Sequence, residues 1–257
     1  RIVAELEPDK AMKLPPVREA ARPGTVKRTV LLSDQAGLVK MAAGLDFLMS
    51  YPYGGTEQRI ARARGMIATK KFRDLLHQES HSDARLKKEV DETLLYLESV
   101  VDTNGLVSYW PGSRGYVSLT AWTLLFLQDA KGAGFKVSEK TEKTLIRTLE
   151  QALRSDYSRF IDGEAYMERA WALTALTAVG KFDPSYASEL ARKARFLDQE
   201  GLAEVLMAYA RSGKGNEQLA KDLEKELFES IVFRLWQSRE IYGGLQTRVS
   251  ARNALIL

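Results

Sequence analysis

Two kinds of helical pattern alternate through most of this chain, and their alternation leaves few folds open. One kind is charged and amphipathic, with leucines at every fourth position that share one helix face, as in Leu145, Leu149 and Leu153. The other kind, as in residues 119–128, is small and apolar on nearly every side. A helix that is apolar all round has to be buried, and amphipathic helices have to shield it. The pattern therefore predicts layers of helices.

A repeat within the apolar helices narrows the prediction. Ala121-Trp122-Thr123-Leu124 and Ala170-Trp171-Ala172-Leu173 place similar residues in successive apolar segments. Self-similarity at roughly 35 to 50 residues is the signature of stacked helical hairpins. An inner ring of helices inside an outer ring buries the apolar helices and exposes the charged ones. The predicted fold is therefore all-α, an α/α toroid of about ten helices, and we expect no strand after residue 32.

Start and stop signals place the helix boundaries. Ser82 and Ser138 are predicted N-caps, because a serine hydroxyl can accept a hydrogen bond from a free N–H in the first helical turn. Asp183 is a third predicted cap, with Pro184 at the first helical position, where proline is favoured. Further helices are predicted from Ser33 to the residue before Pro52, over about residues 56–76, 82–102, 165–179 and 202–211, from Asn216 through Leu235, and from Thr247 onward.

The first 32 residues differ in composition from the rest. They contain Pro8, Pro15, Pro16 and Pro23, and residues 25–32 have the β-branched content of a short strand. We expect an extended connecting arm from a neighbouring domain over residues 1–32 and the toroid domain over residues 33–257. Because the chain begins at Arg1 and ends within an apolar run, we expect a fragment of a longer protein, truncated at its C-terminal end.

Composition excludes several classes of function. The chain has 38 basic and 34 acidic residues, interleaved, and a net charge of +4. A nucleic-acid-binding surface would instead gather its basic residues on one face. With no cysteine in the sequence, disulfides, thiolate nucleophiles and cysteine metal ligands are excluded. No apolar run approaches the roughly 18 residues that a membrane span needs.

One octapeptide carries a family resemblance. In Tyr51-Pro52-Tyr53-Gly54-Gly55-Thr56-Glu57-Gln58, a turn leads into a helix, with Thr56 as the expected N-cap and Glu57 at the positive end of the helix dipole. The octapeptide resembles the thioester loop of the alpha-2-macroglobulin and complement superfamily, whose bacterial members read Tyr-Pro-Tyr-Gly-Cys-x-Glu-Gln. The resemblance covers about residues 33–257 and implies a thioester-type domain, which is an α/α toroid related to those of terpenoid cyclases and prenyltransferases.

The resemblance also shows what is missing. In the family pattern the cysteine thiol and the glutamine side chain condense into an internal thioester that acylates an attacking protease. Here Gly55 stands in the place of the cysteine, and we favour a natural variant over an engineered substitution. Gln58 could supply the acyl carbon, but the Thr56 hydroxyl is a poor nucleophile without a positioned base. Gly55 and Gln58 are therefore predicted to be a non-functional thioester equivalent.

The remaining members of the signature loop are predicted to be structural. Tyr51 and Tyr53 are expected to pack the loop against a neighbour, and Pro52 and Gly54 to shape the turn. No catalytic residue, cofactor or metal ligand is predicted in the loop.

Other candidate sites have ordinary structural interpretations that we favour. His77 and His81 have the spacing of metal ligands on a helix, but we expect them in an inter-helix loop. The acidic residues near Gly163 could form a glycosidase-like pair, yet capping of a helix start is favoured. Trp110 could serve as a glycan platform, but we expect it to pack over the end of the following apolar helix. These acidic residues are Asp162, Glu164 and Glu168. A separate run of basic residues is interpreted as a solvated helix face and comprises Arg59, Arg62, Arg64, Lys70, Lys71 and Arg73.

The resemblance implies a non-catalytic domain of a bacterial protease-trapping protein that works without covalent linkage. Its implied partners are target proteases and the neighbouring macroglobulin and other β domains of the same chain. Its implied location is the periplasm, with inner-membrane association as an option. Two alternatives remain open: a scaffold module that binds other subunits of a cell-envelope complex, and an α/α-toroid enzyme acting on glycans or isoprenoids.

Overall fold

The computed structural model describes residues 9–14, 16, 22, 24–26, 30, 51, 54–70, 82–161 and 165–229, and the backbone of residues 231–235 and 241–245. Within these residues it contains eight α-helices: α2 (Thr56–Thr69), α3 (Asp83–Val100), α4 (Val117–Gly132), α5 (Glu139–Ala152), α6 (Ala165–Ala178), α7 (Pro184–Arg192), α8 (Gln199–Arg211) and α9 (Gln218–Glu229). A 3-10 turn, η3 (Ala194–Phe196), lies before α8. The strands are β1 (Val107–Ser108), β2 (Gly115–Tyr116), β3 (Ile231–Leu235) and β4 (Ile241–Leu245).

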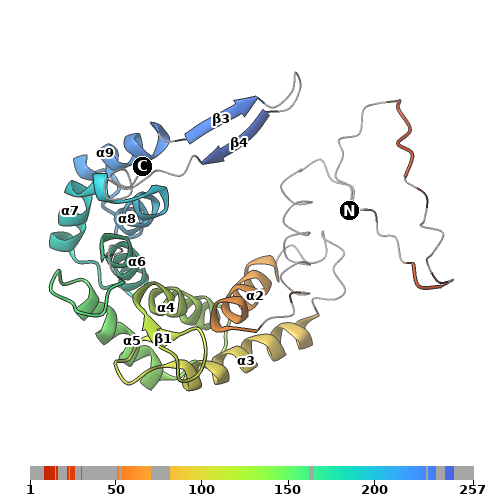
Figure 1. Cartoon of the computed structure of the whole chain (residues 1–257), viewed down its shortest axis with the longest axis horizontal. Coiled ribbons are helices and arrows are strands. Elements are labelled where there is room, and N and C mark those ends of the chain that lie inside the picture. Colours follow the sequence, from red (N-terminus) through yellow and green to blue (C-terminus); the bar gives the residue numbers. More distant parts are fainter. Residues whose placement is uncertain are drawn as a thin grey trace.

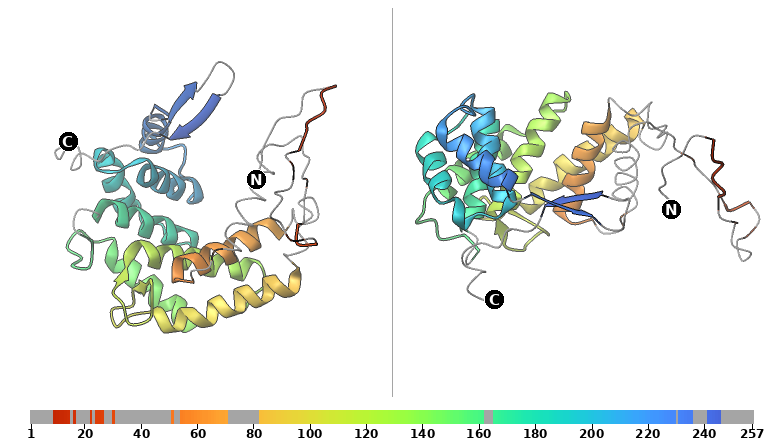
Figure 2. Two further views of the ribbon diagram at one scale, coloured as in Figure 1. Left: turned by 45° about the vertical axis from the view of Figure 1, so that its right-hand side comes forward. Right: turned by 90° about the horizontal axis from the view of Figure 1, so that it is seen from above.

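The helices form two concentric rows. Helices α2, α4, α6 and α8 lie side by side in an inner row, and α3, α5, α7 and α9 lie outside them (Figures 1 and 2). Each inner helix packs against the outer helix that follows it in the chain, so the units are helical hairpins arranged along an arc. This arrangement confirms the predicted all-α fold of stacked hairpins.

Helices α4 and α6 lie in the inner row because most of their side chains are small or apolar. In α4 and α6 most side chains are buried, among them Leu124, Phe126 and Leu173. Helix α8 approaches α6 closely at Gly201, where an added Cβ would lie 2.5 Å from the sulfur of Met167. A larger residue at this position would require the Met167 side chain to move, so Gly201 permits the close packing seen here.

The three predicted caps are present. The Ser82 hydroxyl accepts a hydrogen bond from Arg85 N at 3.3 Å, and Ser138 accepts one from Thr141 N at 3.3 Å. A carboxylate oxygen of Asp183 accepts from two backbone N–H groups at 2.9 and 3.1 Å, and Pro184 is the first residue of α7.

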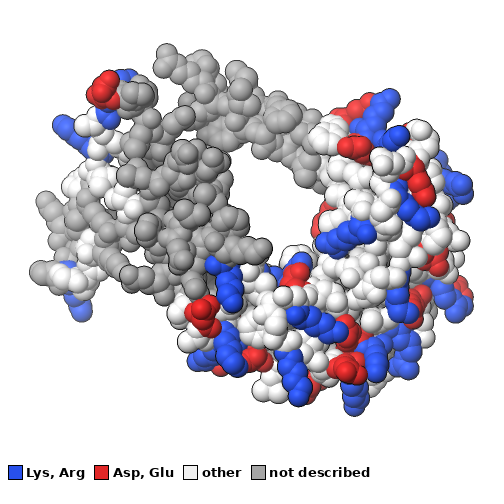
Figure 3. All heavy atoms as spheres, turned by 180° about the vertical axis from the view of Figure 1, so that it is seen from behind, with Lys and Arg blue, Asp and Glu red and all other residues white. Residues whose placement is uncertain are grey.

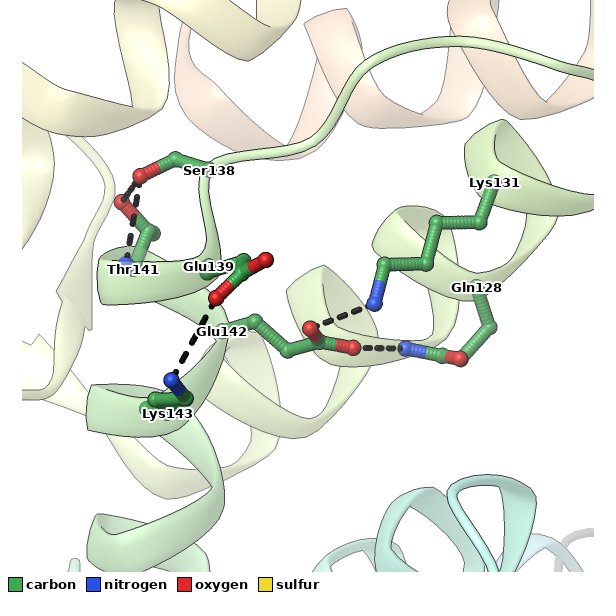
Figure 4. A network of polar contacts seen from close by, with 7 residues as sticks. All are labelled: Gln128, Lys131, Ser138, Glu139, Thr141, Glu142 and Lys143. Atoms are coloured by element: carbon green, nitrogen blue, oxygen red, sulfur yellow. Dashed lines mark hydrogen bonds and ion pairs between the residues drawn. The ribbon is translucent and has the colours of Figure 1, made fainter.

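A charged side chain joins the outer helix α5 to the inner helix α4. Glu142 on α5 accepts hydrogen bonds from Lys131 and, at 2.8 Å, from Gln128, both on α4 (Figure 4). On the face shown in Figure 3, acidic and basic side chains of the described residues are intermingled. Among the described residues, none of the helices is both long and apolar enough to span a bilayer.

The prediction that no strand follows residue 32 is wrong. The strands β1 and β2 form a short antiparallel hairpin ahead of α4, and β3 pairs with β4 beyond α9. Helix α9 ends at Glu229, so Ile231 and Leu235, predicted to continue the helix, lie in β3. Their segment is rich in β-branched and aromatic residues, which suit a strand when a partner strand supplies hydrogen bonds.

Several sequence predictions fall outside the described residues. These are the helices expected before Pro52 and from Thr247 onward, and the residues Pro52, Tyr53, His77, His81, Asp162 and Glu164.

Candidate functional site

The signature loop is anchored to the β1–β2 hairpin through Thr56. Gly55 takes the N-cap position of α2, and Thr56 is the first helical residue, so its predicted capping role is wrong. Its backbone N–H donates to Tyr109 O at 3.0 Å, and its buried hydroxyl lies 2.7 Å from Ser108 O and 3.0 Å from Tyr109 O. The Thr56 hydroxyl therefore hydrogen-bonds to carbonyl groups more than fifty residues away in the sequence, and it does not cap its own helix.

The hairpin is itself held in place by polar contacts. The Ser108 hydroxyl lies 2.9 Å from Val100 O, at the end of α3, and 2.7 Å from Trp110 O. The Asp102 carboxylate accepts hydrogen bonds from the backbone N–H groups of Asn104, Leu106 and Gly115 at 2.8, 3.0 and 3.1 Å. The loop that carries Tyr109 and Trp110 is therefore tied to both sides of the hairpin.

Gly55 is enclosed by two side chains. A Cβ added there would lie 2.8 Å from the Oε1 atom of Gln58 and 3.1–3.2 Å from two ring carbons of Trp110. Non-bonded carbon and oxygen atoms do not approach to 2.8 Å, so any larger residue requires Gln58 or Trp110 to move. The Gln58 carboxamide thus folds back over the position where the family pattern has its cysteine.

Trp110 lies against the signature loop. The residue is 52% exposed, and two of its ring carbons face Gly55. Tyr109 is 37% exposed and makes an edge-to-face contact with Tyr116, with ring centroids 5.3 Å apart. Burial raises the pKa of the Tyr109 hydroxyl, and the nearby Glu57 carboxylate adds to the rise.

Arg59 holds the other side of the loop. Its Nε donates to Gly54 O at 2.8 Å, and its guanidinium lies 4.4 Å from the centre of the Tyr96 ring. Tyr51 is partly buried. Glu57 is exposed in the first turn of α2, where its negative charge interacts favourably with the helix dipole.

The other sequence candidates that the structure describes do not gather into a second site. The Glu168 carboxylate, 3% exposed, accepts hydrogen bonds from Ile161 N at 3.0 Å and Ser118 N at 3.4 Å, which is a structural role. Arg62 and Arg64, from the basic run, pair with Glu89 at 3.3 Å and Asp129 at 2.6 Å within the fold. Within the described ranges, no group of three or more His, Cys, Asp or Glu side chains could hold a metal ion.

Two features of this site could not be seen in the sequence. The attachment of Thr56 to the hairpin and the cover that Trp110 provides over Gly55 both join segments about fifty residues apart. The one local sequence signal is the Trp110-Pro111-Gly112 run, which indicates a loop between β1 and β2.

Comparisons with known proteins point to one group. No family model matches the chain. An alpha-2-macroglobulin from Xylella fastidiosa is 28% identical over an alignment of 212 residues that covers 79% of this chain and 13% of that protein. The chain therefore spans only a small part of the relative's length.

Solved structures share the fold. The native conformation of Escherichia coli alpha-2-macroglobulin aligns with a TM-score of 0.64 and 19% identity, over 74% of this chain and 12% of that one. Salmonella alpha-2-macroglobulin reacted with methylamine aligns with a TM-score of 0.65 and 18% identity, over 75% of this chain and 13% of that one. In sequence this chain is similar to a segment of a bacterial alpha-2-macroglobulin, and it shares the fold of the corresponding segments of the solved ones.

Proposed function

We propose that this chain is the thioester-type domain of a bacterial protein that inhibits proteases by enclosing them, without forming a covalent bond. Its similarity to the Xylella protein and its fold support this assignment. The E. coli relative has been solved after activation by trypsin and by porcine elastase, which supports proteases as targets. We place the protein in the periplasm on the same similarity, with inner-membrane association as a further option.

Gly55 is the observation that carries the proposal. The loop around it matches the family pattern at every fixed position except the cysteine, and the 257 residues contain no cysteine. A thioester needs a sulfur atom, so Gln58 remains an ordinary amide. Inhibition would then rest on conformational change and steric enclosure, with the domain as a non-catalytic, structural component. Neighbouring macroglobulin and other β domains of the same protein are its proposed contacts.

Protease trapping can be tested with the full-length protein. After incubation with trypsin or elastase, we expect one dominant cleavage in the inhibitor, followed by loss of protease activity on a large protein substrate. Activity on a small chromogenic peptide should persist, because a small peptide can enter an enclosed protease. Denaturing electrophoresis should release the protease at its own mass, without an adduct.

Two outcomes would contradict the proposal in different ways. A covalent adduct that survives denaturation would show that the non-covalent part is wrong. Full activity on the large substrate would show that trapping is wrong, and would favour the alternative of a scaffold module for an envelope complex. An enzyme of the α/α-toroid type would require a carboxylate pair at a cleft, and the described member of the acidic group, Glu168, is committed to backbone contacts.

A further inference from the structure

The turn between α3 and β1 contains the one Asn-Gly pair of the sequence, Asn104-Gly105. The side chain of Asn104 is exposed, whereas Gly105 is buried. An Asn-Gly pair is reactive, because glycine has no side chain to obstruct an attack by its own backbone nitrogen on the preceding carboxamide. The pair therefore brings a chemically labile bond into the turn that precedes the β1–β2 hairpin.

The reaction is deamidation through a cyclic imide. The Gly105 nitrogen forms a bond to the side-chain carbonyl carbon of Asn104, and the bond from that carbon to the carboxamide nitrogen breaks. Ammonia leaves with the proton that the Gly105 nitrogen gives up. Water then adds to either carbonyl carbon of the succinimide ring and opens it, which yields aspartate or isoaspartate at position 104. Water is the only co-reactant.

The folded turn restrains the attacking nitrogen. The Gly105 N–H donates to Asp102 O at 3.0 Å, and Gly105 has a φ of +79°. A Cβ added to Gly105 would lie 2.4 Å from Oγ1 of Thr148, so the turn packs closely against α5. To attack, the nitrogen has to leave its hydrogen bond and rotate toward the Asn104 side chain. The turn must therefore open before the reaction can proceed.

The Asp102 carboxylate fixes the turn on both sides of the reactive bond. It accepts hydrogen bonds from the backbone N–H groups of Asn104, Leu106 and Gly115 at 2.8, 3.0 and 3.1 Å. Hydrogen bonds to an ionised acceptor are stronger than those between neutral groups. Because Gly115 belongs to β2, opening the turn also loosens the hairpin.

We propose that Asn104 is a site of spontaneous deamidation that Asp102 keeps closed in the folded protein. Asn104 converts when the turn opens, and conversion prevents the turn from re-forming. Isoaspartate adds one carbon to the backbone between residues 104 and 105, which moves the following N–H groups away from Asp102. Aspartate instead places a second negative charge beside that of Asp102.

Conversion would act on the signature loop through the hairpin. The carbonyl groups of Ser108 and Tyr109, which follow the turn, accept the hydrogen bonds of Thr56. A turn that cannot re-form leaves these carbonyl groups less firmly held. This inference does not depend on protease trapping.

The site can be tested on the full-length wild-type protein. Samples in native buffer and in urea are kept at the same mildly alkaline pH, and peptide mapping by mass spectrometry follows the exchange of the Asn104 NH2 group for OH. We expect conversion about tenfold faster or more in urea, the factor that corresponds to one hydrogen bond to a charged group. In urea Asn104 should also convert faster than Asn216 and Asn253, which precede Glu217 and Ala254.

Two variants test the role of Asp102 in native buffer. Asp102→Ala should speed conversion of Asn104 by about tenfold, because the carboxylate that holds the turn is gone. Asp183→Ala is the matched control. It removes a carboxylate that also accepts backbone N–H groups, at 2.9 and 3.1 Å, but at the start of α7, and it should leave the Asn104 rate unchanged.

Hydrogen exchange tests the consequence of conversion. Converted protein, separated from wild type by its added negative charge, should exchange faster over residues 107–116 and unchanged over α6 and α8. This measurement and the comparison with urea need no variant, so they remain decisive if Asp102→Ala does not fold.

Each of the following results would overturn the proposal. Equal rates of Asn104 conversion in native buffer and in urea would show that the fold does not protect the site. Equal rates in Asp183→Ala and Asp102→Ala would show that loss of any such contact is enough. Unchanged exchange over residues 107–116 in the converted protein would show that the hairpin does not depend on the turn.

Discussion

At the scale of single residues, Gly55 sets both the chemistry and the packing of the signature loop. Lacking a side chain, it lets Gln58 and Trp110 close over the loop, and these two side chains fill the space that a larger residue would need.

The first prediction tests that packing. Gly55→Ala should lower the free energy of unfolding by about 1–3 kcal/mol, because the new methyl group overlaps the Gln58 oxygen and the Trp110 ring. Chemical denaturation provides the measurement. Gly132→Ala is a matched control, since an added Cβ there meets nothing within 4 Å, and it should be neutral or slightly stabilising. Equal effects of the two substitutions would show that Gly55 is not enclosed.

The second prediction concerns the missing bond. Methylamine should leave the wild-type protein with no new thiol and no added mass. In Gly55→Cys we expect a thioester to form: a sulfur–carbon bond to Gln58 replaces the carbon–nitrogen bond, and ammonia leaves with the thiol proton. The separation of 2.8 Å between the Cβ position and Gln58 Oε1 is too short for non-bonded atoms but suits atoms joined through sulfur and a carbonyl carbon.

Mass spectrometry decides the second prediction. Gly55→Cys should be lighter than its sequence by one ammonia, and methylamine should then add its own mass and release one thiol. The double variant Gly55→Cys, Gln58→Ala should keep a free thiol throughout. A folded Gly55→Cys protein with a free thiol and an intact amide would show that Gln58 is not positioned as described.

At the scale of elements, helix pairs are joined by polar contacts that range from buried to exposed. Arg169 on α6 is 2% exposed, and its two Nη atoms lie 2.9 and 2.7 Å from the Glu189 carboxylate on α7. Its Nε also donates to Leu153 O at 2.7 Å, after the end of α5. One buried guanidinium thus ties together three successive elements.

The third prediction follows from that tie. Glu189→Ala should cost about 2 kcal/mol, below the usual value for a broken buried pair because the Glu189 side chain is 38% exposed and water can partly replace it. Glu150→Ala, which breaks the exposed Lys181–Glu150 pair of 2.6 Å, should cost less than about 1 kcal/mol. Equal costs would show that the burial of Arg169 does not matter.

The pH dependence of this pair has a definite sign. The hydrogen bonds from Arg169 lower the pKa of Glu189. The native state therefore favours the ionised carboxylate, so the stabilisation is present above the ordinary pKa of Glu and is lost as the pH falls through the lowered one. Wild type should lose more stability than Glu189→Ala on acidification below about pH 4.5.

At the scale of the whole molecule, the arc places an acid where it depends on pH through the neutral range. Glu204 on α8 is 6% exposed, and this burial raises the pKa of its carboxyl from 4.5 to about 7. Between those values the carboxyl binds more proton in the native state than in the unfolded chain. Its contribution to stability is therefore complete below pH 4.5 and is lost as the pH rises to 7.

The fourth prediction tests this contribution. At pH 8, Glu204→Gln should be more stable than wild type by up to about 3 kcal/mol, since a neutral amide avoids the buried charge. At pH 5 the two proteins should be similar. Denaturant unfolding at both pH values provides the measurement, and parallel pH profiles would contradict the assignment of a raised pKa to Glu204.

Much of the fold could be predicted from the sequence because its signals are local. The caps at Ser82, Ser138 and Asp183, and the alternation of apolar with amphipathic helices, depend on residues within a few turns of one another. The absence of any cysteine settled, without a structure, that this chain cannot form a thioester.

Tertiary structure decided what depends on distant segments. The partners of Thr56, the place of Trp110 and the change from helix to strand after Glu229 depend on groups that local periodicity does not contain. The burial of Glu204 also depends on distant segments, and in the sequence this residue is only one more polar position. A side chain's neighbours across the inner row are fixed only when the hairpins stack into an arc, because the curvature of that arc determines which distant residues meet.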